Sequence, residues 1–271
     1  MPPALLRAWE ARYGLLTPSR SAGGFRLYSE DDEARVRRMR SLQEEGLSAA
    51  EAARLALESG WAPADSSART LDEAATDLRL ALERYDEVES QAVFDRLLTT
   101  LTLDTVLAEV VLPCLREIGA RWERGEISVA QEHFAANLMR GRLLALARGW
   151  GQGRGPRALL ACAPGELHDV GLISFGLALR ARGWTITFLG ASTPVETLAA
   201  VAELVAPELL VVSATTAERF EENAEHLRAL ATEWPLALGG AGASEAFASA
   251  IGAQFLGEDP VAEAEHVARG A

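Results

Sequence analysis

Hydrophobic and polar positions change their rhythm along this chain, and the changes divide it into segments. Between residues 71 and 148 apolar side chains recur at helical spacing, and Pro113 is the only proline. Two runs show the spacing: Leu78, Leu80 and Leu82, and then Leu107, Val110, Val111, Cys114 and Leu115. Apolar residues spaced in this way form one face of an amphipathic helix. We therefore predict a bundle of about four helices over residues 71–149.

Beyond residue 157 the pattern changes to short apolar runs that alternate with amphipathic stretches. The five runs are RALLACA at 157–163, WTITFLG at 184–190, LLVVSAT at 209–215, PLALGG at 235–240 and AQFLG at 253–257. Strands that alternate with helices form a parallel sheet covered by helices on both faces. The pattern predicts an α/β domain over residues 157–271, flavodoxin-like (Rossmann-type), with a five-stranded parallel sheet.

Two stretches rich in Gly, Pro and small polar residues separate these segments. They are GWAPADSSART at 60–70 and GWGQGRGPR at 149–157. Such compositions favour turns and irregular connections. We predict linkers at both places, which leaves residues 1–59 as a separate N-terminal domain.

Composition fits a globular protein with one large domain or two to three small ones. Of the 271 residues, 49% are hydrophobic and 24% charged. No apolar run reaches the roughly 18 residues that span a bilayer, and the N-terminus lacks the pattern of a secretory signal. Cys114 and Cys162 fall in apolar segments and give no disulfide framework. We expect a cytoplasmic location without membrane contact.

The net charge of −13 is unevenly distributed. Residues 1–46 carry eight Arg and seven acidic side chains, so that the remaining 225 residues carry a net charge of −14. An acidic surface repels phosphate, which argues against general adhesion of the whole chain to nucleic acid.

Polar residues and glycines follow three of the predicted strands. They are Glu166, His168, Asp169 and Gly171 after the first strand, Ser213 and Thr215 at the end of the third, and Gly239 and Gly240 at the end of the fourth. Ligands of parallel sheets bind beyond the carboxyl ends of the strands. A loop histidine can bind a metal while Glu166 or Asp169 accepts its other N–H. Each feature alone is more often an ordinary cap or turn, but together they indicate a ligand site.

These residues resemble the D/E-x-H-x-x-G, S-x-L and GG signature of cobalamin-binding domains. The resemblance implies that His168 replaces the benzimidazole of the cofactor as the lower axial ligand of cobalt. It also implies that Ser213, Gly239 and Gly240 line a cleft for the displaced nucleotide tail. Thr215 stands where the signature has Leu, and Glu166 where it commonly has Asp.

The helical segment carries Trp122 followed ten residues later by Glu132 and His133. This W-x9-E-H pattern resembles that of light-sensing, cobalamin-dependent regulators similar to CarH and LitR. The resemblance implies that the bundle caps the upper face of the corrin, with Trp122 against the upper axial group and the other two nearby. Without the downstream domain, Trp122 would be read as core and the pair as a solvated helix face. Some such sensors have a His after the Trp, which the resemblance implies can bind cobalt once light has removed the upper group. Here that position is Glu123, and His133 is the alternative second histidine for such a bis-His product.

The N-terminal stretch resembles a MerR-type winged helix-turn-helix. LRAWEARYG resembles its recognition helix, PSRSAGGFRLYS its wing and EDDEARVRRMRSLQEEG the helix that follows. The resemblance implies DNA contacts by Arg7 and Arg12 in the major groove and by Arg20 and Arg26 on phosphates. The family pattern has a further helix before the recognition helix, so we expect a partial domain over residues 1–59.

The sequence therefore predicts a multidomain regulator that is not an enzyme. Adenosylcobalamin is the expected cofactor, with methylcobalamin as the alternative. Operator DNA and further copies of the chain, as a dimer or tetramer, are the expected partners. The alternative function is a corrinoid carrier component of a methyltransferase or mutase, which would have no use for a winged helix. A third is a regulator that responds to a partner protein or another tetrapyrrole.

Overall fold

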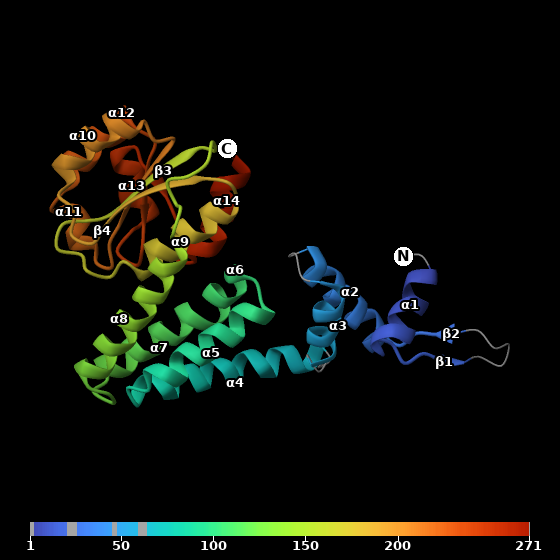
Figure 1. The fold of residues 1–271 in the computed structure, drawn as a ribbon. Coiled ribbons are helices and arrows are strands. Elements are labelled where there is room, and N and C mark those ends of the chain that lie inside the picture. Colours follow the sequence, from blue (N-terminus) through green and yellow to red (C-terminus); the bar gives the residue numbers. More distant parts are fainter. Residues whose placement is uncertain (1–2, 21–25, 45–47, 59–63, 271) are drawn as a thin grey trace. The chain divides into compact units, whose positions relative to one another are not determined.

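The computed structural model describes residues 3–20, 26–44, 48–58 and 64–270. The chain divides into two compact units, residues 1–70 and residues 71–271. Figure 1 colours the ribbon by position in the sequence, from blue at the N-terminus to red at the C-terminus. Each unit has a hydrophobic core of its own, as expected of separate domains. Within the described ranges, no helix is both long enough and apolar enough to cross a bilayer.

The first unit has the order of elements that the sequence predicts for a winged helix. Its elements are α1 (Pro3–Tyr13), β1 (Ser19–Arg20), β2 (Arg26–Leu27), α2 (Glu30–Glu44) and α3 (Ala49–Glu58). Strands β1 and β2 pair antiparallel, with Ser19 opposite Leu27. The small core is formed by Trp9, Leu15, Leu16, Met39, Leu42 and three alanines of α3. The helix, hairpin and helix that we predicted here are confirmed.

The second unit begins with four helical rods. They are α4 (Ala64–Glu83), α5 (Glu87–Thr100), the continuous run of α6 (Leu103–Thr105), η1 (Val106–Val111) and α7 (Leu112–Glu123), and α8 (Val129–Leu146). Segment η1 is a π-helix, and Pro113 follows it. Because proline has no N–H with which to continue the helical ladder, a widened turn before it is physically reasonable.

Two details of the bundle differ from the sequence prediction. Helix α4 begins at Ala64, so the linker predicted over residues 60–70 is wrong from that residue onward. No Gly or Pro occurs between residues 64 and 83 to interrupt the helix. Leu78 and Leu82 are fully buried, whereas Leu80 is 38% exposed. Residues four apart share a helix face, but the residue between them points away from it.

The α/β domain contains the predicted five-stranded sheet. Its strands are β3 (Arg157–Cys162), β4 (Thr185–Gly190), β5 (Leu209–Ser213), β6 (Leu236–Gly239) and β7 (Gln254–Phe255). The order is β4-β3-β5-β6-β7 and every pairing is parallel. Strand β4, the next in the chain, pairs with one side of β3, and β5, the strand after it, pairs with the other side. The switch point of the sheet, where ligands bind in such folds, therefore lies at the carboxyl ends of β3 and β5.

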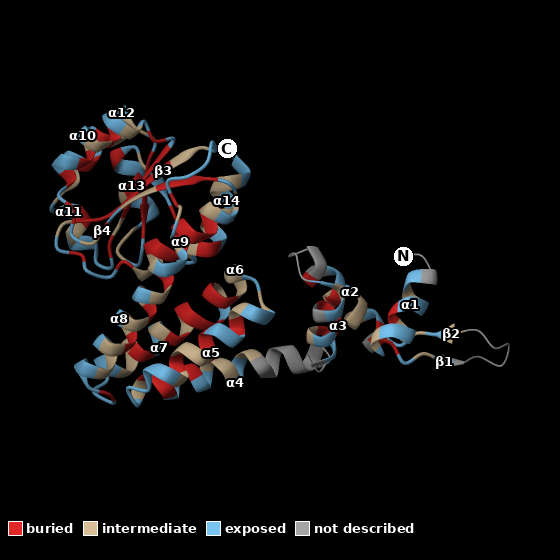
Figure 2. Cartoon of the chain, in the orientation of Figure 1, coloured by how far each residue is buried: buried red, intermediate tan, exposed pale blue. Residues whose placement is uncertain are grey.

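Helices cover both faces of this sheet, and the central strands β3, β5 and β6 are mostly buried (Figure 2). Helices α9 (Val170–Ala181) and α14 (Pro260–Gly270) pack on one face and share a continuous core with the bundle. The other face is covered by α10 (Val195–Val205), α11 (Ala217–Glu221), α12 (Ala224–Glu233) and α13 (Glu245–Ile251). An ion pair of 2.8 Å between Arg182 Nη2 and Asp104 Oδ2 also joins α9 to the bundle. The bundle and the α/β domain thus share one hydrophobic core and form one compact unit.

We predict that Phe94→Ala lowers the free energy of unfolding of residues 71–271 by about 3–5 kcal/mol, because it opens a cavity in this shared core. Phe94 is fully buried, whereas Val88, on the same helix, is 81% exposed. Val88→Ala is the control and should have little effect. Urea unfolding followed by circular dichroism measures both. Equal effects of the two substitutions, or separate transitions for bundle and sheet, would contradict the shared core.

Candidate functional site

The loop of residues 164–171 begins where β3 ends, at the switch point. The Glu166 amide donates to the Ala163 carbonyl at 3.0 Å, and Gly165 has a φ of +73°. Arg219 Nη1 donates to the Pro164 carbonyl at 3.0 Å. A Cβ on Gly165 would lie 2.2 Å from that Nη1 atom. Glycine is therefore favoured here by the backbone angle, and a Cβ would also push the Arg219 guanidinium away from the loop.

Glu166 binds the loop to the next strand end. Its side chain is only 1% exposed. Oε2 accepts from the Thr215 amide at 2.7 Å and from the Thr215 hydroxyl at 2.5 Å. Oε1 accepts from the His168 amide at 2.8 Å and lies 2.6 Å from His168 Nδ1. One buried carboxylate thus connects Glu166, His168 and Thr215, three of the residues that the sequence singled out.

These hydrogen bonds keep Glu166 ionised. Burial acts to raise its pKa, but the donors from Thr215 and His168 outweigh burial and lower the pKa from 4.5 to about 2. A carboxylate that carries a full charge can only accept hydrogen bonds. The proton of the neutral imidazole must then sit on Nδ1, and the lone pair is left on Nε2.

The structure decides which carboxylate orients His168. The sequence left Glu166 and Asp169 open, and the contact is made by Glu166. The His168 side chain is 72% exposed, so that its ring is accessible to a ligand. The carboxylate of Asp169 is buried and binds Arg140 of α8 instead. Of the two carboxylates that the sequence left open, Asp169 is therefore not the one that contacts the His168 ring.

A cleft runs along the sheet edge beside this loop. Its cavity volume is about 80 Å³, and the cleft opens to solvent. The lining comes from α9, the ends of β5 and β6 and the start of α14: Gly171, Leu172, Phe175, Val211, Ser213, Gly239, Gly240, Leu256, Gly257, Glu258, Pro260 and Glu263. The structure thus brings Gly171, Ser213 and the glycine pair together.

The glycine pair allows the strand end to turn. Gly240 has a φ of +90°, and a Cβ on it would lie 2.4 Å from the Ala214 carbonyl oxygen. A Cβ on Gly239 would meet nothing closer than 3.7 Å, at Leu256. Gly240 is therefore required by the fold itself, whereas at Gly239 the absent side chain leaves space.

Trp122, Glu132 and His133 lie on the two bundle helices α7 and α8. Trp122 is in the last turn of α7 and is 45% exposed. Glu132 is in the first turn of α8, where His133 Nε2 lies 3.6 Å from its Oε2. Within the described part of the chain, no hydrogen bond, ion pair or ring contact joins Trp122 to His168. The Trp122 side chain is accessible, not core.

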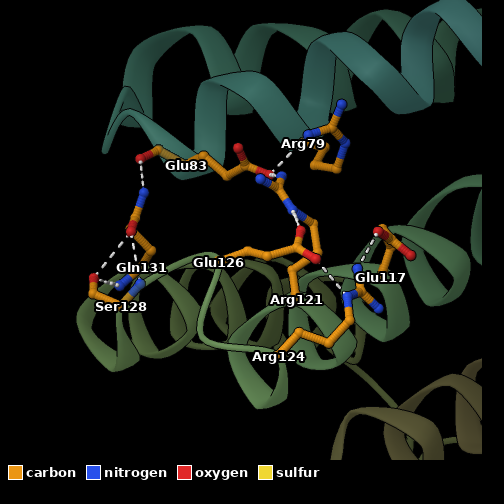
Figure 3. Close-up of polar contacts among 8 residues, drawn as sticks. All are labelled: Arg79, Glu83, Glu117, Arg121, Arg124, Glu126, Ser128 and Gln131. Atoms are coloured by element: carbon orange, nitrogen blue, oxygen red, sulfur yellow. Dashed lines mark hydrogen bonds and ion pairs between the residues drawn. The ribbon is translucent and has the colours of Figure 1, made fainter.

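A charged network holds the turn that connects these two helices (Figure 3). Arg121 pairs with Glu83 at the end of α4, and its Nε donates to Glu126 Oε2 at 3.0 Å. Gln131 Nε2 donates to the Glu83 carbonyl at 2.8 Å. Hydrogen bonds from Arg124 and Arg121 lower the pKa of Glu126. The network fixes the backbone on both sides of Trp122.

The arginines predicted to contact DNA lie on α1 and the hairpin. Arg7 and Arg12 are exposed on α1. Arg26 Nε donates to Glu10 Oε2 of α1 at 2.8 Å, and this hydrogen bond raises the pKa of Arg26. Arg26 thus ties the hairpin to α1. The side chain of Arg20 lies outside the described residues.

Sequence reasoning missed two arginines that hold the loop and eight of the twelve residues that line the cleft. Arg219 lies four residues after Thr215, and Arg140 lies two turns along α8 from His133. The cleft residues from Leu256 to Glu263 follow the fifth strand. The rule that ligands bind at strand ends could have found this last group.

We predict a pH dependence from Glu166. Since its folded pKa is depressed, its stabilisation is complete above the usual value of 4.5 and is lost as the pH falls toward about 2. The difference in free energy of unfolding between the wild type and Glu166→Gln should shrink over this window by on the order of 3 kcal/mol. Urea unfolding at a series of pH values measures it. A difference that stays constant from pH 6 to pH 2 would show that Glu166 is not specially stabilised.

We also predict opposite outcomes for the glycine pair. Gly240→Ala should destabilise the cofactor-free protein by about 1–3 kcal/mol, because the new Cβ is strained and meets a carbonyl oxygen. Gly239→Ala should leave stability unchanged or raise it by about 0.5 kcal/mol. Thermal unfolding of the two variants tests the assignment. Similar losses in both would contradict it.

Comparison with known proteins agrees with the order of these domains. Residues 1–58 match the MerR HTH family regulatory proteins. Residues 74–147 and 156–267 each match a family described as a B12 binding domain. The bundle and the α/β domain are thus both cobalamin-binding domains by family.

Full-length relatives and one solved structure extend this match. The HTH-type transcriptional repressor CarH of Myxococcus xanthus is 36% identical over 252 residues, which are 88% of this chain and 84% of the relative. CarA of the same organism is 38% identical over 262 residues, 93% and 87% of the two chains. The monomethylamine corrinoid protein of Methanosarcina barkeri shares the fold of the second unit, with a TM-score of 0.63, 20% identity and coverage of 74% of this chain and 99% of that one. The chain therefore belongs to the family of CarH and CarA, and it is a MerR-type, cobalamin-binding transcriptional regulator.

Proposed function

We propose that the protein is a light-responsive repressor controlled by adenosylcobalamin. The cofactor would bind between the helical bundle and the α/β domain and control the assembly of a homo-oligomer on operator DNA. The observation that carries the proposal is the hydrogen bond between buried Glu166 and His168 Nδ1, which prepares the opposite nitrogen for cobalt.

The residues at the sheet edge fit a corrin cofactor. A corrin supplies the equatorial ligands of its cobalt, so one imidazole from the protein is sufficient. In the described residues, no group of three or more His, Cys, Asp or Glu side chains could hold a free metal ion. His168 instead offers one exposed ring whose tautomer Glu166 fixes, as in other histidine–carboxylate metal sites.

The cleft fits the second part of the cofactor. When His168 takes the lower position, the nucleotide tail needs a narrow path along the sheet edge. Gly171, Ser213 and Gly239 line such a path. Ser213 offers a hydroxyl donor, while the apolar side chains of α9 and β5 offer a surface for a flat ring. We propose that this cleft holds the tail.

The upper face would be covered by Trp122, Glu132 and His133. The adenosyl form supplies a cobalt–carbon bond that light breaks. Trp122 offers a rigid, half-exposed indole that can exclude water from an upper ligand, and Glu132 can accept hydrogen bonds from a ribose. The methyl form would leave Trp122 without a large group to cover, which is why we favour the adenosyl form. Glu123, and not a histidine, follows the tryptophan. We therefore propose His133 as the second imidazole that would bind cobalt.

Control of DNA binding would follow from assembly. Arg7 and Arg12 of α1 would enter a groove, and Arg20 and Arg26 of the hairpin would reach phosphates, Arg26 while its Nε remains bound to Glu10. One such module binds weakly, whereas a dimer or tetramer joins several and raises their joint affinity. A structural change in the bundle that covers the upper face would alter the oligomer and release operator DNA. Such a regulator acts in the cytoplasm, where the DNA is.

A corrinoid carrier is the second candidate, because the fold of the second unit resembles that of a corrinoid protein. The winged helix of the first unit favours the regulator over the carrier, because a carrier of methyl groups has no use for a DNA-binding domain. A carrier would also bind cobalamin through His168 but would not change size in light.

We predict that the protein binds adenosylcobalamin in the dark with a base-off, His-on spectrum. Green light should bleach that spectrum and shift the elution volume in size-exclusion chromatography. His168→Ala should lose the His-on spectrum, because no other ring is held at that position. His226→Ala, at an exposed histidine of α12, is the matched control and should behave as the wild type.

Two outcomes would overturn parts of the proposal. If light changes neither spectrum nor size, the protein is a carrier or a dark regulator. If His168→Ala retains the His-on spectrum, another group binds the cobalt.

A further inference from the structure

One ion pair joins the cap helix to the loop that carries His168. Arg140 of α8 donates from Nε to both carboxylate oxygens of Asp169, at 2.8 and 2.9 Å, and from Nη2 to Oδ2 at 2.8 Å. The Asp169 side chain is 1% exposed and the Arg140 side chain 40% exposed. The hydrogen bond to Asp169 raises the pKa of Arg140. A forked arginine contact of this kind fixes direction as well as distance.

Each partner belongs to a segment that also carries proposed cofactor-binding residues. Asp169 follows His168 directly in the chain, whereas Arg140 lies on the helix that carries Glu132 and His133. From Glu132 to Arg140 the helix rises by about 12 Å. Through this ion pair, a displacement of α8 along its axis would act on Asp169 and on the adjoining backbone of His168.

Asp169 does not serve the ordinary purpose of its position. It is the N-cap residue of α9, yet its side chain forms no capping hydrogen bond. Its oxygens bind Arg140 across the junction of the bundle and the α/β domain instead. Apolar contacts also join these two parts, but such contacts have no direction. The ion pair is a directional contact between α8 and the His168 loop.

We propose that Arg140 is a positioning residue that couples the upper and lower faces of the cofactor site. Through Asp169 it holds His168 at a fixed place relative to Glu132 and His133. The assignment of the upper and lower faces of the cofactor site rests on the proposed function. Because such coupling is reciprocal, the upper group influences the lower ligand and the lower ligand influences the cap.

The first test uses the cofactor-free protein and does not depend on the proposed function. Arg140→Gln leaves Asp169 buried without its partner, which should loosen the loop. We expect amide hydrogen exchange in residues 166–170 to rise by about fivefold or more. Arg142→Gln is the matched control, since Arg142 also lies on α8 but pairs with Asp95 inside the bundle. Unchanged exchange in Arg140→Gln, or an equal rise in the control, overturns the proposal.

Arg140→Lys distinguishes the effect of the positive charge from the effect of the paired hydrogen bonds to Asp169. A lysine keeps the positive charge but cannot make two parallel hydrogen bonds. We expect its exchange rates to lie between those of the wild type and Arg140→Gln. Rates equal to the wild type would show that charge alone holds the loop and would overturn the role of the forked contact.

The second test measures the coupling itself. It compares the affinity for adenosylcobalamin with that for hydroxocobalamin, which lacks the bulky upper group. The ratio should fall by about tenfold in Arg140→Gln, a loss of about 1.4 kcal/mol of coupling, and should be unchanged in Arg142→Gln. If the ratio falls equally in both, the proposal is wrong. A wild type without any preference would refute the proposed adenosyl pocket, while the exchange experiment would still decide the role of Arg140.

Discussion

Glu166 keeps its charge beneath the protein surface because four donors surround its two oxygens, two from His168 and two from Thr215. An isolated carboxylate in such a place would be strongly unfavourable. With these donors it fixes the loop after β3, joins it to the end of β5 and selects the tautomer of His168. The chemistry proposed for the site depends on this one group, since a mobile or reversed imidazole would not present Nε2 to a metal.

The elements around the site were predictable because they follow from local patterns. Five apolar runs predicted five parallel strands, and the spacing around Leu107 predicted bundle helices. The placement of His168 and Gly240 at strand ends also followed, since parallel strands all end at the same edge. Thr215 shows the limit of a motif. It departs from the signature, and the structure gives the reason: its hydroxyl donates to Glu166 at 2.5 Å, a bond that leucine cannot make.

Contacts between distant segments were not predictable. The choice between Glu166 and Asp169 depended on Arg140, which lies 29 residues before Asp169 on a helix whose direction the sequence does not give. The buried Leu78 and exposed Leu80 could not be told apart by hydrophobicity, because only packing decides which helix face is covered. The start of α4 was missed because residues 64–70 were taken together with Gly60 and Pro63 as one linker, although no Gly or Pro lies between residues 64 and 70.

The central claim is that His168 supplies the lower ligand of cobalt. Electron paramagnetic resonance of bound cob(II)alamin, with the histidines of the protein labelled with nitrogen-15, tests it most directly. The account predicts that labelling changes the hyperfine splitting from the axial nitrogen in the wild type. A splitting unaffected by labelling would show that the axial nitrogen belongs to the cofactor, and the account of the site would be wrong.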